Sequence, residues 1–78
     1  MKEKNLVKQI AIILDIPEKQ LVKINNFDLL ENYDSLKQLE LLTFYDKYFK
    51  KKNIVKSIAT EKNLKKILAV LKKEKAIF

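Results

Sequence analysis

The 78-residue sequence contains no cysteine, no histidine and no glycine. Without cysteine and histidine there are no disulfides, no zinc or iron–sulfur ligation, and no Ser-His or Cys-His nucleophile pairs. Without glycine the chain lacks the dinucleotide and P-loop phosphate cradles, whose backbones need glycine to approach phosphate closely. These absences exclude most mechanisms that a chain can perform alone, so we expect no catalytic residues, no metal site and no enzyme activity.

Long apolar runs are also missing, since no stretch approaches the length that spans a bilayer. The charged start, Met1 to Lys4, leads into an apolar stretch that ends at Asp15 without a small-residue cleavage pattern. A hydrophobic fraction of 47% argues against disorder. We therefore expect one soluble, cytoplasmic domain over residues 1–78, without membrane insertion.

All 17 basic residues are lysine, and with 10 acidic residues they give a formal net charge of +7. This balance suggests polyanionic partners. One basic cluster is interleaved with aromatic residues: Lys47, Lys50, Lys51, Lys52, Tyr45, Tyr48 and Phe49. A lysine-rich nucleic-acid-binding protein is thus an alternative. Because arginine is absent and the charges spread over every expected helix, we favour a solvated surface and expect no nucleic-acid partner.

Helical periodicity predicts an all-α domain. A first helix over residues 2–14 carries Leu6, Ile10, Ile13 and Leu14 on one face and is ended by Pro17. Residues 17–34 form a long connection with one helical turn near 18–23. A second helix is expected over 34–49, a short one near 54–58, and a last one after an N-cap at Thr60. The outline is a small four-helix bundle of three main helices and one short helix.

The expected core follows from the apolar faces of the later helices. We expect it to be lined by Leu41, Tyr45, Phe49, Leu64 and Leu68, with Leu42 and Tyr48 on the same broad stripe. A narrower second stripe, Leu36, Leu39 and Thr43, is not needed by the core and is a candidate contact surface. In a chain without glycine, asparagine is best able to adopt left-handed backbone angles, which we expect at Asn26, Asn32 and Asn53.

The tripeptide Asp34-Ser35-Leu36 places a serine hydroxyl in the first turn of a helix, directly after the long connection. Asp34 can cap the free N–H groups of that turn. A helix N-terminus carries a positive partial charge, so a phosphate esterified to Ser35 would be stabilised there. Taken alone, a serine in this place is most often only a local cap.

Around this tripeptide the chain resembles the acyl carrier and peptidyl carrier protein family over almost its whole length. In that family a serine in an Asp-Ser-Leu motif opens the second helix of a four-helix bundle and carries a phosphopantetheine arm. Further matching positions are Phe27 in the preceding loop, Tyr33 before the motif, Leu39, Glu40 and Leu41 after it, and Phe49 near the helix end.

The resemblance implies that a phosphopantetheinyl transferase, using coenzyme A, modifies Ser35, with Asp34 and Leu36 beside it. The terminal thiol of the arm would hold an acyl or aminoacyl group as a thioester for acyl-loading, acyl-modifying and acyl-transferring enzymes. The implied partner-binding residues are Leu36, Lys37, Leu39, Glu40 and Thr43. The expected protein is a monomeric carrier.

The family's second helix is usually acidic, whereas Lys37 and Lys47 lie on this one. We therefore expect a specialised carrier, in a lipid or secondary-metabolite pathway with dedicated partners, rather than the general carrier of fatty acid biosynthesis. Two alternatives stay open beside nucleic-acid binding. One is a carrier-like interaction module that is never modified; the other, ranked last, is a membrane-surface helix at the lysine-rich C-terminus.

Overall fold

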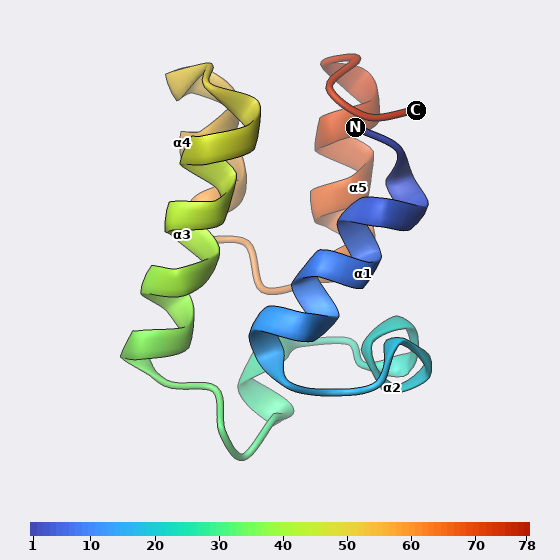
Figure 1. The fold of residues 1–78 in the computed structure, drawn as a ribbon, viewed down its shortest axis with the longest axis vertical. Coiled ribbons are helices and arrows are strands. Elements are labelled where there is room, and N and C mark those ends of the chain that lie inside the picture. Colours follow the sequence, from blue (N-terminus) through green and yellow to red (C-terminus); the bar gives the residue numbers. More distant parts are fainter.

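The computed structural model describes residues 1–78, and its regular structure is entirely helical (Figure 1). This confirms the predicted all-α class. The five α-helices and one 3-10 helix are α1 (Glu3–Leu14), α2 (Glu18–Lys23), η1 (Phe27–Leu29), α3 (Ser35–Phe49), α4 (Lys52–Ala59) and α5 (Leu64–Lys73). No helix is both long enough and apolar enough to cross a lipid bilayer.

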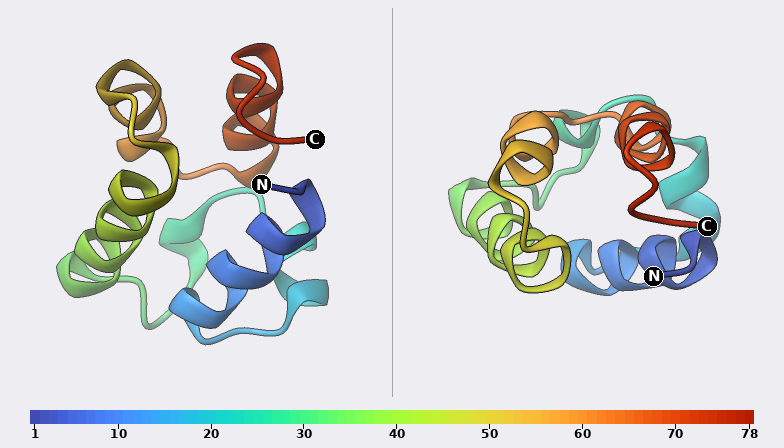
Figure 2. Two further views of the ribbon diagram at one scale, coloured as in Figure 1. Left: turned by 45° about the horizontal axis from the view of Figure 1, so that its top comes forward. Right: turned by 90° about the horizontal axis from the view of Figure 1, so that it is seen from above.

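Helices α1, α3, α4 and α5 surround a common core (Figure 2), and α2 packs against α1 in the lower part of the molecule as drawn in Figure 1. Helix α3 packs against both α1 and α4, and α4 packs against α5. The two chain ends meet beside α1 and α5, where the Glu3 N–H donates to the Phe78 carbonyl over 2.8 Å. All 18 buried residues are hydrophobic, so burial of apolar surface is the main stabilising contribution to this small domain.

The core assignments are mostly confirmed. Leu41, Tyr45, Phe49 and Leu64 are buried, and Leu68 packs half-buried against them. The prediction for Tyr48 is wrong, because its side chain is 50% exposed. Phe44, one turn earlier on the same side of α3, is buried instead, with its ring centroid 4.9 Å from that of Tyr48. In the last turn of α3 the buried place is taken by Phe49, so the Tyr48 ring is left half exposed with its hydroxyl in water.

Residues 24–34, between α2 and α3, are held by both side chains and backbone. Phe27 is fully buried, its N–H donates to the Lys62 carbonyl over 2.8 Å, and its ring meets Tyr33 edge to face. The amide nitrogen Nδ2 of Asn63 donates to the Asn25 carbonyl over 2.8 Å. These contacts fix the connection against the linker between α4 and α5, so α3 starts from a defined position.

The left-handed backbone positions are Asp15, Lys50 and Lys75, with φ of 57°, 45° and 58°. The prediction of asparagine at such positions is therefore wrong. Asn26 adopts an extended φ of −153° and caps η1, since its side chain accepts a hydrogen bond from the Asp28 N–H. An N-cap residue has extended backbone, and the short side-chain amide of asparagine can then accept a hydrogen bond from the first turn of the helix. In Asn26 this role replaces the predicted left-handed conformation.

The predicted N-cap at Thr60 is also wrong. Thr60 follows the last turn of α4, and α5 begins only at Leu64, with Asn63 as the N-cap whose side chain accepts from the Lys66 N–H. The three residues between them form the linker that pairs with residues 24–34. A linker whose conformation depends on contacts with a distant segment gives no periodic pattern in the sequence. The preference of threonine for helix starts therefore predicts the wrong N-cap here.

Candidate functional site

The start of α3 is built by a side-chain cap on Asp34. Asp34 has extended backbone, and its Oδ1 atom accepts a hydrogen bond from the Lys37 N–H over 3.0 Å. Its carbonyl accepts the first backbone bond of the helix, from the Gln38 N–H. The predicted cap is confirmed, and it fixes Ser35 as the first residue of a 15-residue helix.

Ser35 lies in this first turn with its side chain exposed and without a hydrogen bond to any other part of the chain. The chain's second serine, Ser57, differs, because its hydroxyl donates to the Asn53 carbonyl over 2.9 Å. The backbone N–H groups of Ser35 and Leu36 also have no acceptor within the chain. The hydroxyl and two donors are thus available together for an anionic group outside the chain.

The narrow stripe on α3 lies outside the core, as predicted. The side chains of Leu36 and Leu39 are 61% and 58% exposed. Thr43 is exposed as well, and its hydroxyl donates back to the Leu39 carbonyl over 2.9 Å. Two exposed leucines one turn apart, next to Ser35, give this side of α3 an apolar surface that no other helix covers.

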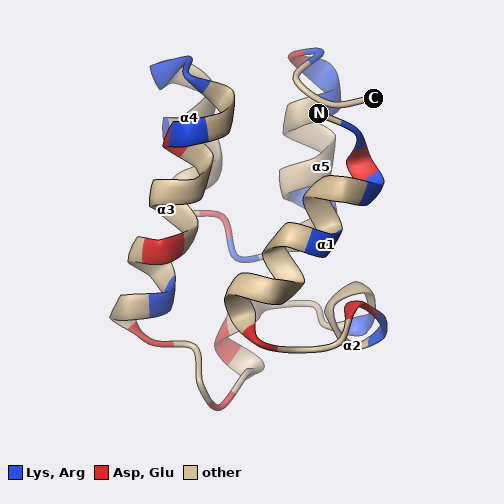
Figure 3. Ribbon diagram, viewed as in Figure 1, with Lys and Arg blue, Asp and Glu red and all other residues tan.

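The charge around Ser35 is more acidic than the composition of the chain implies. Asp28, Glu31, Asp34 and Glu40 lie on the connection and the first turns of α3, with two lysines among them, Lys37 on that helix and Lys62 paired with Asp28 (Figure 3). The ammonium group of Lys37 is 3.9 Å from Glu40 Oε2. Lys47, the other lysine on α3, is about 18 Å along the helix from Ser35 at 1.5 Å per residue. The excess of lysine is therefore located elsewhere.

Tyr33, directly before the cap, lies near an ion pair that the sequence did not indicate. Lys62 Nζ lies 2.9 Å from Asp28 Oδ2, and this hydrogen bond raises the pKa of Lys62. Burial raises the pKa of the nearby Tyr33 hydroxyl, an effect that the charge of Lys62 partly offsets. The Lys62 and Asp28 side chains are 34 residues apart in the sequence, so no local pattern could have revealed the pair.

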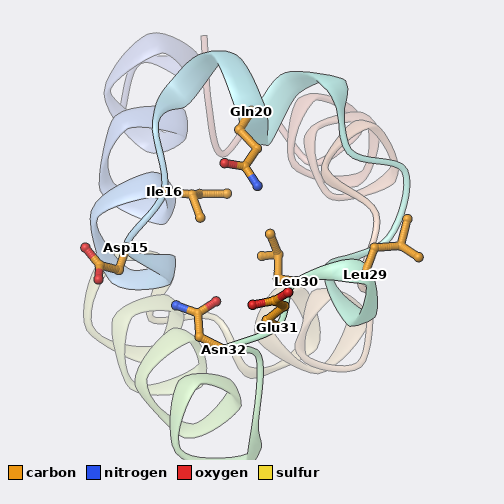
Figure 4. Close-up of a pocket in the computed structure, with 7 residues that line it drawn as sticks. All are labelled: Asp15, Ile16, Gln20, Leu29, Leu30, Glu31 and Asn32. Carbon is orange, nitrogen blue, oxygen red and sulfur yellow. The ribbon is translucent and has the colours of Figure 1, made fainter.

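A depression of about 420 Å³ lies between the turn after α1 and the connection that leads to α3 (Figure 4). Figure 4 shows Ile16 and Gln20 on one side and Leu30 and Asn32 on the other pointing toward it. Asn32 also donates from Nδ2 to the Leu14 carbonyl over 3.0 Å, which joins the connection to the end of α1. The depression therefore borders the segment that positions the cap.

The basic and aromatic cluster at the other end of α3 does not form a stacking surface. Tyr45 and Phe49 are buried. Only Tyr48 is left beside the lysines, with Lys47 Nζ 5.8 Å from the centroid of its ring. A surface that binds single-stranded nucleic acid would need several exposed rings for successive bases.

No protein family, curated protein or solved structure matches this chain. Function must therefore be argued from the site and not from a relative. The site comprises the free hydroxyl of Ser35, the Asp34 cap, the open N–H groups of the first turn and the exposed leucines beside them.

Replacement of Asp34 by alanine is expected to lower the free energy of unfolding by about 1 kcal/mol, because the Lys37 N–H loses its acceptor. Asp34→Asn should keep most of this stability, since the amide oxygen can accept the same bond. Urea titration of the three proteins measures the difference. Equal stability of Asp34→Ala and the parent would contradict the capping role.

Proposed function

We propose that this chain is a carrier domain in which Ser35 holds a phosphopantetheine arm derived from coenzyme A. The observation that carries the proposal is the exposed hydroxyl of Ser35, free of internal hydrogen bonds, in the first turn of α3. The bound arm would supply a thiol that holds an acyl or aminoacyl group as a thioester. Since the chain has no cysteine, this thiol would be its only one.

The residues at the start of α3 fit the phosphate of such an arm. In the transfer, the Ser35 oxygen would form a bond to the phosphorus that bears the pantetheine in coenzyme A. The bond from that phosphorus to the nucleotide phosphate breaks, adenosine 3′,5′-bisphosphate leaves, and the serine proton is lost. The free N–H groups of Ser35 and Leu36 can then donate to the phosphodiester oxygens. The Asp34 carboxylate accepts from the Lys37 N–H and so leaves the N–H groups of Ser35 and Leu36 without an acceptor in the chain.

The side of α3 next to Ser35 suits contact with partner enzymes. Leu36 and Leu39 offer apolar contact, Thr43 extends the same stripe, and Lys37 and Glu40 place one charge of each sign along it. A phosphopantetheinyl transferase and the enzymes that load, modify and transfer the acyl group must each approach Ser35, so they would share this surface. The protein's own role is to hold and deliver the group, and the chemistry belongs to its partners.

The test is the intact mass of the protein after incubation with coenzyme A and a broad-specificity phosphopantetheinyl transferase. We expect a gain of one phosphopantetheine and the appearance of one titratable thiol in a chain that has none. Incubation without the transferase is the control. If the mass did not increase with any of several transferases, the proposal would be contradicted. An interaction module that is never modified would then be the better interpretation of the surface on α3.

A further inference from the structure

The end of the molecule opposite Ser35 carries much of the lysine. It comprises the start of the chain, the turn between α3 and α4, and the last turn of α5 with the residues after it (Figure 3). Its basic residues are Lys2, Lys4, Lys50, Lys51, Lys52, Lys72, Lys73 and Lys75, and its acidic ones are Glu3 and Glu74. Of these lysines only Lys72 forms an ion pair, with Glu3 at 2.6 Å. We call this surface the basic end.

The segments of the basic end lie close together in space. A depression of about 180 Å³ is lined by residues from both parts of this end: Tyr48, Phe49, Lys51 and Ile54 around the α3–α4 turn, and Glu74, Lys75 and Ala76 after α5. The view along the long axis shows the α3–α4 turn, the top of α5 and both termini around one end of the bundle (Figure 2). The unpaired ammonium groups therefore form one positive surface, and their mutual repulsion is relieved by a polyanionic surface.

An exposed aromatic side chain is fixed at this same end. The Phe78 side chain is 78% exposed, although its neighbour Ile77 is buried. The Phe78 backbone is held on both sides, because its N–H donates to the Met1 carbonyl over 3.2 Å and its carbonyl accepts from the Glu3 N–H. Tyr48, 50% exposed, adds a second ring beside the depression. The basic end thus combines lysine with two exposed rings, and the backbone that carries one of them, Phe78, is hydrogen-bonded on both sides.

We infer that the basic end docks on an anionic lipid surface, with its lysines against the headgroups and Phe78 entering the interface. Each lysine near such a surface raises the affinity about fivefold, and apolar side chains add to the attraction. The lysines would also attract nucleic acid, but the chain has no arginine for base contacts, and the two exposed rings, Phe78 and Tyr48, are too few to stack a row of bases. The apolar face of α5 is already buried in the core, so docking uses the end of the bundle and inserts no helix.

This arrangement also orients the molecule. Helix α3 runs from Ser35 toward Lys50, so the acidic surroundings of Ser35 lie at the far end of a molecule 31 Å long. A negative surface attracts one end and repels the other. Docking would therefore leave Ser35 and the exposed leucines facing water, whether or not Ser35 is modified.

Vesicle co-sedimentation with two matched variants tests the inference. The triple variant Lys51→Gln, Lys52→Gln, Lys73→Gln changes the basic end, and the control Lys19→Gln, Lys23→Gln, Lys65→Gln changes lysines on α2 and in the first turn of α5. All six are exposed and outside the ion pairs, and each variant lowers the net charge from +7 to +4. On phosphatidylcholine vesicles containing phosphatidylglycerol, we expect affinity to fall about 100-fold in the basic-end variant and much less in the control.

The apolar contribution is tested by Phe78→Ser, which should weaken binding by roughly fivefold to tenfold without changing the melting temperature. Equal losses in the two triple variants, or equal binding to vesicles of phosphatidylcholine alone, would overturn the inference. The inference would also be overturned if the protein bound a DNA oligonucleotide more tightly than the vesicles at the same ionic strength, and if Phe78→Ser did not change the binding to DNA. This result would identify nucleic acid as the polyanion.

Orientation has its own measurement, because single cysteines can be labelled uniquely in a chain without cysteine. An environment-sensitive fluorophore on Tyr48→Cys should shift to the blue when anionic vesicles are added. The same fluorophore on Leu36→Cys should not shift. A shift at Leu36 and none at Tyr48 would reverse the proposed orientation and contradict docking through the basic end.

Discussion

Ser35→Ala is expected to abolish the phosphopantetheine mass gain completely, whereas Ser57→Ala leaves it unchanged. The two serines are the only ones in the chain and both are exposed. They differ in setting: Ser35 has a free hydroxyl in the first turn of α3, while Ser57 lies within α4 and donates to the Asn53 carbonyl. A transferase acting on any accessible serine would modify both, and one that needs an open helix N-terminus would modify Ser35 alone.

The measurement is intact mass after incubation of each variant with coenzyme A and transferase. Circular dichroism melting of both variants is the control, and we expect changes within about 0.5 kcal/mol because neither side chain is buried. A mass gain that persists in Ser35→Ala, or disappears only in Ser57→Ala, would show that the attachment site is wrong. A thiol titration on the same samples separates phosphopantetheine from other adducts.

The helices with strong periodicity were predictable from the sequence. Helix α1 was expected over 2–14 and is Glu3–Leu14, and α3 was expected over 34–49 and is Ser35–Phe49. Each has a boundary residue with a clear local role. Asp34 caps the start of α3, and Pro17, three residues after the end of α1, stops that helix from continuing. The start of α5 does not follow from the sequence, because Lys62 and Asn63, directly before it, are held by contacts with residues 25–28, far away in the sequence.

The candidate site was predictable where it depends on one helix. The cap at Asp34, the position of Ser35 and the exposure of Leu36 and Leu39 all follow from the periodicity of α3. Two features did not follow. The position of Tyr33 near the Lys62–Asp28 pair and the separation of charge between the two ends both depend on how the helices pack. The composition gives a net charge of +7 but does not say where the charges lie. The lysines on α3 therefore predict a less acidic site than the one in the structure.

Tyr45→Ala is expected to lower the free energy of unfolding by about 3–5 kcal/mol, as for other truncations of large buried aromatic residues. Tyr45 is 2% exposed, and its ring lies near those of Phe44 and Phe49, with centroid separations of 5.9 and 6.5 Å. A domain of this size has roughly 4–12 kcal/mol of stability in total. The loss would therefore be a large fraction of it, and urea titration measures it directly.

Tyr45→Phe separates the ring from the hydroxyl. The Tyr45 hydroxyl is buried without a hydrogen-bond partner, so its removal should leave stability unchanged or raise it by about 1 kcal/mol. Burial also raises the pKa of this hydroxyl above its usual value of 10.0. Above that pH the unfolded chain releases the proton while the folded chain retains it, so stability falls as pH rises.

Urea titrations at pH 7 and above pH 10 should therefore show the parent losing stability relative to Tyr45→Phe. Lysine deprotonation affects both proteins equally, so it cancels in this difference. If Tyr45→Phe were destabilised by more than about 1 kcal/mol at pH 7, the hydroxyl would have a partner in the folded protein. If the two proteins kept the same difference at alkaline pH, Tyr45 would be accessible to water. The first result would contradict the unpartnered hydroxyl, and the second would contradict the burial on which the core of α3, and with it the placement of Ser35, depends.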